Sequence, residues 1–422
     1  MILLFSIFFI LLLLRVPVAI SLAVSSIIML LQGNFNLDMF AHRMFSSLDS
    51  FTLMTIPGFV LAGVILAKGG ITKYLIEAIR SWIAHLPGGL SVVAILACMF
   101  FASISGSSPA TAAAVGAIMI PSMIKNNYSA KYSMGIVAAG GTLGILLPPS
   151  IALIMYGVIA QVSIGDLFIA GIIPGILLGL ALVTVAIFFA WKNGYKSEGK
   201  SSWAERGKHS LKAIWGAFLP FIILGSIYSG VATPTEAAVI SVFYALFVSV
   251  FIYKELLWKD VRPILVETIN ITSMIFLIIG AASLFSLYLT NEQIPQQLGQ
   301  WIQDANMSKT LFFISTGILF FILGMFLDPI SVIVITLPIF LPVLEVLDIN
   351  SIHFAIVMTI NIELAMITPP VGLNLFVVSS IARKKMGHAV QGVLPFMLVM
   401  VFVLIIIIAI PSISTWLPQF MK

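Results

Sequence analysis

Long apolar stretches separated by short polar segments run along almost the whole chain. Ile169–Ala190 and Ala389–Ile410 are the clearest, and Ala213–Tyr228 extended by its flanks is a third. A helix needs about 20 mostly apolar residues to cross the hydrocarbon core of a bilayer. Only helices and closed barrels satisfy their backbone polar groups in lipid, so these runs are predicted to be transmembrane helices. We expect an all-α polytopic membrane protein.

The first apolar run, Met1–Leu14, continues past Arg15 and Pro17 into a second run that ends near Leu31. It lacks the basic segment that begins a secretory signal peptide. A cleaved signal peptide and a retained membrane segment are both compatible with the pattern, and the missing basic segment favours the retained one.

Four apolar regions are interrupted by residues that break helices. In the first half these are the small polar run Ser103–Thr111 and the combination of Gly140–Gly144 with Pro148–Pro149. In the second half they are Gly324–Pro329 and Ile367–Pro370. Proline removes a backbone donor and restricts the residue before it, so a continuous helix through these points is disfavoured. The alternative is that glycine and proline only kink or closely pack ordinary helices; four interruptions in corresponding places favour true breaks.

Landmarks in the two halves of the chain recur at a nearly constant offset, which is the signature of an internal repeat. The pairs 221 positions apart are Pro148 with Pro369, Pro149 with Pro370, Gly171 with Gly392, and Pro174 with Pro395. Pro109 and Pro329 lie 220 positions apart, and Trp82 and Trp301 lie 219 apart. Each unit is interpreted as an amphipathic helix, an apolar helix, an interrupted segment, a further apolar helix, a second interrupted segment and a long closing helix.

The repeat itself does not reveal whether the second unit is inverted relative to the first. Repeats in secondary transporters are commonly inverted, with the binding site at the midplane where discontinuous helices meet. An odd number of crossings between corresponding points would invert the unit. The number of crossings stays open, because an interrupted segment can enter and leave on one side.

The interruptions carry the chemistry that a membrane site needs. Backbone freed from a helix survives at membrane depth only when it is buried in protein or lines a wet cavity. At the tip Ser105–Ser108 we expect a re-entrant hairpin whose carbonyl oxygens can bind a hard cation such as Na⁺. A helix that begins near Pro109 would turn its N-terminus toward an anion.

Asp328 is the most informative single residue, since a carboxylate in an apolar stretch is costly and usually marks an ion path. The alternative is a helix N-cap beside Pro329, and both roles can hold together. Glu363 is a second acid in an apolar run, for which a structural contact and a functional role are equally supported. Thr233–Glu236 fits a structural capping box. The amphipathic stretches around Trp82 and Trp301 are expected at the membrane interface.

Composition narrows the class further. The chain has 60% hydrophobic and 9% charged residues and a mean hydropathy of +1.15, whereas soluble domains carry about a quarter charged residues. Its net charge of +5 does not indicate nucleic acid, because the basic residues gather in short segments, as the positive-inside rule describes. These segments are Lys192–Lys212, Lys254–Arg262 and Arg383–Lys385. The surroundings are expected to be a lipid bilayer, with no nucleic-acid partner.

Enzyme chemistry is not supported. The single cysteine, Cys98, excludes an internal disulfide and a cysteine metal cluster. The sequence has no phosphate-binding loop and no nucleophile elbow. A membrane-embedded enzyme would need paired acids or histidines on facing helices, and the sequence offers only Asp328 and Glu363 for that role.

Taken together, these motifs resemble the large membrane subunit of tripartite ATP-independent periplasmic (TRAP) transporters, the DctM/SiaM type. The resemblance covers nearly the whole chain, from about Pro57 to the end. The segments that carry it are Ser105–Ser107, Gly144–Ser150, Ile169–Gly175, Thr233–Glu236, Leu323–Asp328 and Thr368–Pro370.

The resemblance implies an elevator-type transporter of two inverted repeats, in which a transport domain of hairpins and broken helices moves against a scaffold. The implied domains are residues 1–50 (scaffold helices), 51–190 (first repeat), 191–263 (basic linker and scaffold helices) and 264–422 (second repeat). It also implies a Na⁺ gradient as the driving force and a multi-pass location in the bacterial inner membrane. The implied partners are a small four-helix membrane subunit (DctQ/SiaQ type) and a periplasmic binding protein (DctP/SiaP type) that delivers an organic acid.

The family pattern also implies two sodium sites. The first maps onto Ser105, Ser107, Gly144, Leu147 and Pro149, several of them through carbonyl oxygens. The second maps onto Gly324, Asp328, Thr368 and Val371. The first lacks a carboxylate at the position that matches Asp328, so the two sites need not bind Na⁺ equally well.

Substrate contacts are expected from Ser107, Ser108 and Ser150, because of their place at the breaks. Within the family the sequence is most similar to sialic acid members in Ser105–Ser108 and Pro148–Ala152, although C4-dicarboxylate members share much of both segments. We therefore rank sialic acid first as substrate and a C4-dicarboxylate next. The alternative function is a cation-coupled anion exchanger or channel that works without a binding protein.

Overall fold

The computed structural model describes residues 2–33 and 35–421, and every regular element within these ranges is helical. Seven helical stretches among the described residues have the length and composition of membrane spans. Large apolar side chains such as Phe221, Phe243 and Leu398 are between 63% and 70% exposed. Apolar surface of this kind suits lipid rather than water. The prediction of an all-α polytopic membrane protein is confirmed.

The helices before the basic linker alternate between short broken pieces and long spans. They are α1 (Ile2–Leu13), α2 (Val18–Gln32), α3 (Leu37–Leu48), α4 (Thr55–Lys68), α5 (Ile71–Ile83), α6 (Gly89–Ser105), α7 (Ser108–Lys125), α8 (Ala130–Thr142), α9 (Ile151–Ala160) and α10 (Ile164–Lys192). A 3₁₀ turn at Phe51–Met54 precedes α4, and another at Leu143–Ile145 follows α8.

The second part of the chain begins in the basic segment. Its helices are α11 (Trp203–Ala217), α12 (Leu219–Tyr228), α13 (Pro234–Phe247), α14 (Trp258–Asn291), α15 (Ile294–Asp304), α16 (Lys309–Gly324), α17 (Pro329–Val346), α18 (Ser351–Met366), α19 (Leu373–Ala382), α20 (Met386–Ala409) and α21 (Ser412–Phe420). A π-turn at Val248–Ile252 extends α13. The second half of the segment Lys192–Lys212 is therefore helical.

Helices α5–α10 and α15–α20 follow the same order of element types. Each series starts with a short amphipathic helix and ends with a long span, and each contains two interruptions. The interruptions fall at 106–107 and 143–150 in the first series and at 325–328 and 367–372 in the second. All four breaks predicted from glycine and proline are confirmed. The double prolines at 148–149 and 369–370 both contain a cis peptide bond.

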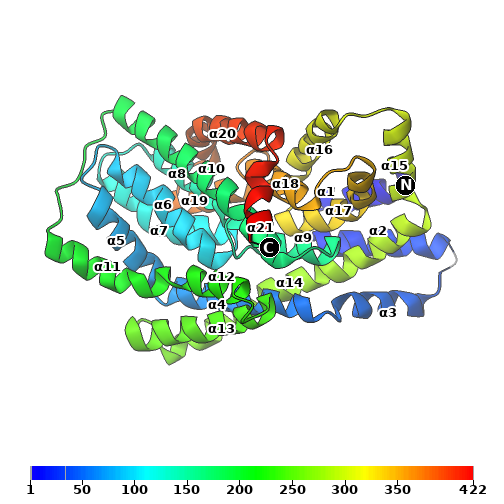
Figure 1. Ribbon diagram of the computed structural model, residues 1–422, viewed down its shortest axis with the longest axis horizontal. Helices are drawn as coiled ribbons and strands as arrows, with labels where there is room; N and C mark the ends of the chain where they lie inside the picture. Colours follow the sequence, from blue (N-terminus) through cyan, green and yellow to red (C-terminus); the bar gives the residue numbers. More distant parts are fainter. Residues whose placement is uncertain (1, 34, 422) are drawn as a thin grey trace.

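The molecule is elongated in the plane of Figure 1, with the first helices of the two series toward opposite ends and the later ones packed against the other series. Helices α5–α8, blue to cyan, lie at one end, and α15–α17 with α1 lie at the other. Helices α4, α12 and α13 follow one long edge, where α4 packs against α13 and α14. Helix α14 also packs against α2 and α3, so these helices form one continuous framework.

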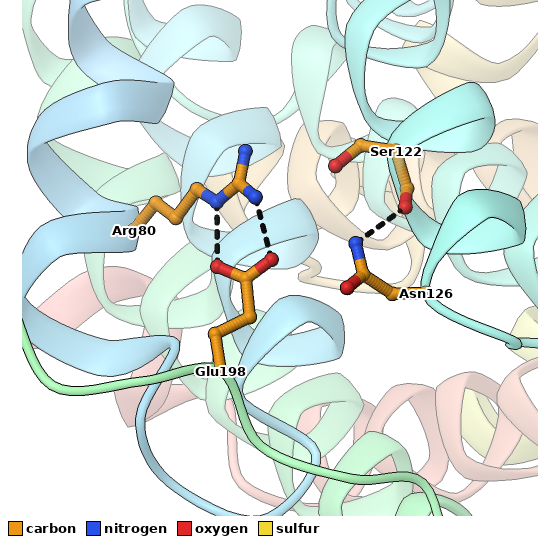
Figure 2. A network of polar contacts seen from close by, with 4 residues as sticks. All are labelled: Arg80, Ser122, Asn126 and Glu198. Atoms are coloured by element: carbon orange, nitrogen blue, oxygen red, sulfur yellow. Dashed lines mark hydrogen bonds and ion pairs between the residues drawn. The ribbon is translucent and has the colours of Figure 1, made fainter.

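The basic segment is tied to the amphipathic helix α5. The guanidinium of Arg80 donates two hydrogen bonds to the carboxylate of Glu198, with Nε and Oε2 2.7 Å apart. Figure 2 shows this pair beside Asn126, at the end of α7, whose amide donates to the Ser122 carbonyl. The hydrogen bond to Glu198 raises the pKa of Arg80 above its ordinary value. Tyr195 of the same segment stacks on Tyr128, between α7 and α8, at 4.2 Å between ring centres.

The capping box predicted at Thr233–Glu236 is confirmed. The Thr233 hydroxyl accepts from the Glu236 backbone N–H, and the Glu236 carboxylate accepts from the Thr233 N–H. Both amphipathic stretches that contain Trp82 and Trp301 are helical, as predicted, in α5 and α15. Trp82 is 45% exposed and Trp301 is 58% exposed, which suits side chains at a lipid–water boundary.

Candidate functional site

The first interruption is a tight turn held by hydroxyl groups. Helix α6 ends at Ser105, and Gly106 takes a left-handed conformation with φ of +61° that glycine adopts without steric cost. The Thr111 hydroxyl donates to the Ser107 carbonyl oxygen at 2.8 Å and lies 2.8 Å from the Ser105 hydroxyl. Three oxygens from Ser105, Ser107 and Thr111 therefore gather at the tip.

The second interruption of the first series packs directly against this tip. A Cβ on Gly144 would lie 2.6 Å from the Ser107 carbonyl oxygen, so the two backbones approach more closely than any side chain permits. The Ile151 backbone N–H donates to the Gly106 carbonyl at 3.4 Å, and the Pro149 carbonyl oxygen lies next to Gly106. The two breaks thus form a single unit.

The structure therefore brings Ser105, Ser107, Gly144 and Pro149 together, four of the five residues assigned to the first sodium site. The fifth, Leu147, turns its side chain toward Gly175 of α10. All residues from 141 to 150 are buried. Carbonyl and hydroxyl oxygens grouped in this way are ligands that suit a hard monovalent cation.

The breaks of the second series are built around a carboxylate. Asp328 is the N-cap of α17: one oxygen accepts from the Ser331 backbone N–H at 3.0 Å and the other from its hydroxyl at 2.5 Å. The N-cap interpretation of Asp328 is thereby confirmed, and its role in cation binding stays a prediction. A carboxylate that accepts two hydrogen bonds still has lone pairs for a cation.

The remaining residues assigned to the second sodium site are linked less directly. A Cβ on Gly324 would lie 2.7 Å from the Ala365 side chain, which brings the end of α16 against the last turn of α18. The Thr368 hydroxyl donates to the Leu364 carbonyl at 2.7 Å. Val371 is partly buried in the same break, while the prolines at 369 and 370 are exposed.

A cavity of about 360 Å³ lies where the broken helices meet the framework. The N-terminal residues of four helices, α7, α9, α17 and α19, line one side. Residues of the framework helices α4 and α14 also line the cavity. The first N–H groups of a helix have no partner within the helix, and its N-terminus carries a partial positive charge that attracts anions. Some of these groups are already bonded, because Ile151 of α9 donates to Gly106 and Ser331 of α17 donates to Asp328. Four N-termini at one cavity still favour an anionic ligand through their partial charge.

The three serines assigned to substrate occupy different positions. Ser107 and Ser108 line the cavity. The Ser108 hydroxyl is fully buried and bonded to the Asn374 side chain at 2.8 and 3.1 Å. Ser150 is the N-cap of α9; its hydroxyl donates to the Ile145 carbonyl and accepts from the Leu153 backbone N–H.

Asn374 and Glu267 were missed from the sequence. Asn374 also donates to the Ala138 carbonyl at 3.0 Å, and so joins α19 to the first hairpin and to α8. Its partners lie 236 and 266 positions away in the chain, so nothing near it in sequence could indicate the contact. Glu267 lines the cavity from α14. Glu267 could have been identified from the sequence, because it is an acidic residue in an apolar run, as Asp328 is.

Glu363 lies outside this cavity. It is fully buried on α18, and neither carboxylate oxygen has a hydrogen-bond partner among the described residues. The neighbouring Asn361 donates to the Val357 carbonyl within the same helix. Glu363 is therefore not among the residues that line the cavity with Ser107, Ser108 and Asp328.

Comparison with known proteins gives consistent results at the level of the family. Residues 5–413 match the model of the tripartite ATP-independent periplasmic transporter, DctM component. The chain is 41% identical to a C4-dicarboxylate TRAP transporter large permease protein of Pseudomonas aeruginosa, covering 90% of this chain and 89% of that protein. It is 37% identical to the corresponding protein of Rhodobacter capsulatus, covering 96% and 95%.

A sialic acid TRAP transporter large permease protein of Vibrio cholerae is 33% identical, with 96% of this chain and 95% of that protein covered. Among solved structures, the YdaH transporter of Alcanivorax borkumensis has a TM-score of 0.57 at 10% identity, covering 89% of this chain and 88% of that chain. At this identity the likeness concerns the fold alone. The chain is a membrane-embedded transporter subunit, not an enzyme, and it belongs to the DctM family of large permeases of tripartite ATP-independent periplasmic transporters.

Proposed function

We propose that this chain carries an organic acid across the bacterial inner membrane, coupled to the inward movement of Na⁺. The observation that carries the proposal is the cavity lined by four helix N-termini, with grouped oxygens beside it. The N-termini supply positive partial charge for a carboxylate without a basic side chain. The oxygens at Ser105 and Ser107 and the carboxylate of Asp328 supply cation ligands close to the same cavity.

Sodium and substrate then support each other electrostatically. A cation bound beside Asp328 offsets its negative charge, which would otherwise repel a carboxylate in the same cavity. Likewise, a bound carboxylate strengthens cation binding. This reciprocity is the thermodynamic requirement for coupling two ligands.

An elevator movement is supported by the two-sided cavity. The broken helices contribute one side, and α4 and α14 of the framework contribute the other. If the two series are inverted repeats, the hairpins and broken helices can move as one body past this framework, which matches the way in which transporters of this kind alternate access. The proposed scaffold segments are residues 1–50 and 191–263, and the proposed repeats are 51–190 and 264–422; α4 and most of α14, at the start of each repeat, stay with the scaffold.

The comparisons shift the order of candidate substrates. Relatives named for C4-dicarboxylates are 41% and 37% identical, and the relative named for sialic acid is 33% identical. Relatives named for isethionate and for ectoine show that the family serves several small polar solutes. We therefore place a C4-dicarboxylate first and keep sialic acid as the second candidate.

The proposed transporter has three components. The small four-helix subunit is supported by an isethionate relative of Oleidesulfovibrio alaskensis that is named DctMQ, of which this chain covers 65%. The third component is proposed to be a periplasmic protein that delivers the solute, which the words tripartite and periplasmic in the family description support.

Reconstitution in proteoliposomes tests the proposal. With the small subunit and the binding protein present, uptake of labelled succinate should require an inward Na⁺ gradient. Uptake that is unchanged in K⁺ would contradict sodium coupling, and uptake by this chain alone would support a binding-protein-independent exchanger or channel instead. Preference for sialic acid over succinate would place sialic acid first among the candidate substrates, as the sequence motifs do.

A further inference from the structure

An ion pair joins the two framework helices beside the cavity. The Nζ atom of Lys68, the last residue of α4, is 2.8 Å from Oε2 of Glu267 on α14. Glu267 lines the cavity together with Val64 of α4 and Ile271 of α14. The side chains of Lys68 and Glu267 are 34% and 49% exposed, so the pair is accessible rather than sealed in the core.

The position of this pair is unusual for charged residues. Glu267 belongs to the span Trp258–Asn291, and α4 belongs to the span Phe51–Lys68. Ionised side chains within membrane spans are costly, and they usually face the path of an ion or a charged solute. A brace between α4 and α14 could be made from apolar side chains alone.

The neighbours of Lys68 identify the side of the membrane. A Cβ on the next residue, Gly69, would meet Ser249, and one on Gly70 would meet Glu255. Ser249 shortly precedes the basic segment Lys254–Arg262, and Glu255 lies within it. Basic loops are retained in the cytoplasm, so Lys68 lies at the cytoplasmic end of α4, where an imported solute leaves. It follows Ala67 and pairs with Glu267, both of which line the cavity.

We propose that Lys68, held in place by Glu267, is a substrate contact on the exit path: it receives the anionic group as that group leaves the four helix N-termini. This proposal rests on the proposed function for the presence of an anionic substrate. Glu267, which lines the cavity, keeps the ammonium group beside the cavity and offsets its charge, so the contact attracts an anion without trapping it. Because the pair belongs to the framework, it meets the substrate only at the cytoplasmic end of the movement.

The electrostatic part of the proposal can be tested without a substrate. The one cysteine of the chain, Cys98, is fully buried, so a cysteine introduced as Ile271→Cys reports on the cavity one helical turn beyond Glu267. The probes are two methanethiosulfonate reagents of similar size, one with a sulfonate and one with a trimethylammonium group. The measured quantity is the ratio of their modification rates, anionic over cationic.

In the Ile271→Cys background, Lys68→Gln should lower this ratio at least about threefold, because an unpaired Glu267 then repels the anionic reagent. Glu267→Gln should raise the ratio, since it leaves the ammonium group uncompensated. Lys73→Gln is the matched control. Lys73 lies on α5, away from the cavity, and its Nζ atom is 3.8 Å from a carboxylate oxygen of Glu255. The ratio of modification rates should not change in this variant. A ratio that does not respond to Lys68→Gln overturns the proposal.

A transport assay tests whether the charge of Lys68 contributes to uptake of the substrate. In the complete three-component transporter, Lys68→Gln should lower the maximal uptake rate at saturating binding protein, and Lys68→Arg should retain it. A normal rate with Lys68→Gln, despite a changed reagent ratio, also overturns the proposal. If the unaltered protein takes up no organic anion at all, the proposed function fails, whereas the reagent ratios still decide whether Lys68 and Glu267 set the charge of the cavity.

Discussion

In the first series, α7 begins after Ser107, whose side chain makes no capping bond, whereas α17 in the second series begins after Asp328, whose carboxylate caps the helix through Ser331. The first tip gathers neutral hydroxyl and carbonyl oxygens. Its companion break, residues 143–150, is entirely buried, while the prolines at 369 and 370 are exposed. Two breaks of the same design therefore differ in charge and in access.

This difference teaches how one architecture can make two unequal cation sites. A neutral oxygen cage depends on geometry, because each carbonyl contributes little unless all are in place. A site with a carboxylate depends more on charge, which acts over a longer distance and tolerates small displacements. In the second series we expect substitutions that change charge to have the larger effect on cation binding. In the first series we expect substitutions that change shape to have the larger effect.

The largest effect is expected from Asp328→Asn. Asparagine keeps an acceptor for the Ser331 N–H, so α17 stays capped, but the negative charge is lost. The Na⁺ concentration for half-maximal uptake should rise about tenfold or more, since a charge-assisted contact is worth about 1.5–3 kcal/mol. Asp348→Asn, at a fully exposed carboxylate, is the control and should leave Na⁺ dependence unchanged. An unaltered sodium requirement in Asp328→Asn would contradict the assignment of Asp328 to a second sodium site.

Gly144→Ala tests the role of shape in the first series. The added methyl group would lie 2.6 Å from the Ser107 carbonyl oxygen and 2.9 Å from the Ser108 nitrogen, so the hairpin tip has to move. We expect a loss of about 1–3 kcal/mol in stability and strongly reduced uptake. Gly387→Ala in α20, with nothing within 4 Å of the new methyl group, is the matched control. Thermal unfolding followed by tryptophan fluorescence measures the first effect; equal melting temperatures for both variants would refute the close contact.

Asn374→Leu tests the link between the two series. It removes the bonds to Ser108 and to the Ala138 carbonyl in a fully buried place. The expected cost is about 1–3 kcal/mol, because the Ser108 hydroxyl is left without a partner. A double-mutant cycle with Ser108→Ala should show coupling between the two changes. Strict additivity would mean that the bond contributes nothing to stability.

Ser105→Ala is expected to have the smallest effect. It removes one of several neutral oxygens at the first tip and a bond to Thr111, worth about 0.5–1.5 kcal/mol. The half-saturating Na⁺ concentration should rise by a few-fold at most, well below the change in Asp328→Asn. Ser103→Ala, which removes a hydroxyl bonded to Phe100 within the same helix, is the control. A larger effect for Ser105→Ala than for Asp328→Asn would reverse the comparison between the two series.

The sequence by itself determined the spans, the four breaks and the capping box, because these depend on local rules. Apolar runs of membrane length, prolines without a donor and the spacing of Thr233 and Glu236 act within a few residues of each position. The order of element types in the two series could also be predicted, since the landmarks recur at nearly one offset.

Only the tertiary structure decided which oxygens and charges share a cavity. Gly144 against Ser107, Asn374 against Ser108, and Lys68 against Glu267 join segments that are tens to hundreds of positions apart. Such pairs depend on how whole helices pack, because a side chain's partner across a helix interface is not encoded in its own neighbours. The structure also separated Glu363 from the cavity that Asp328 lines, although both are acids in apolar runs.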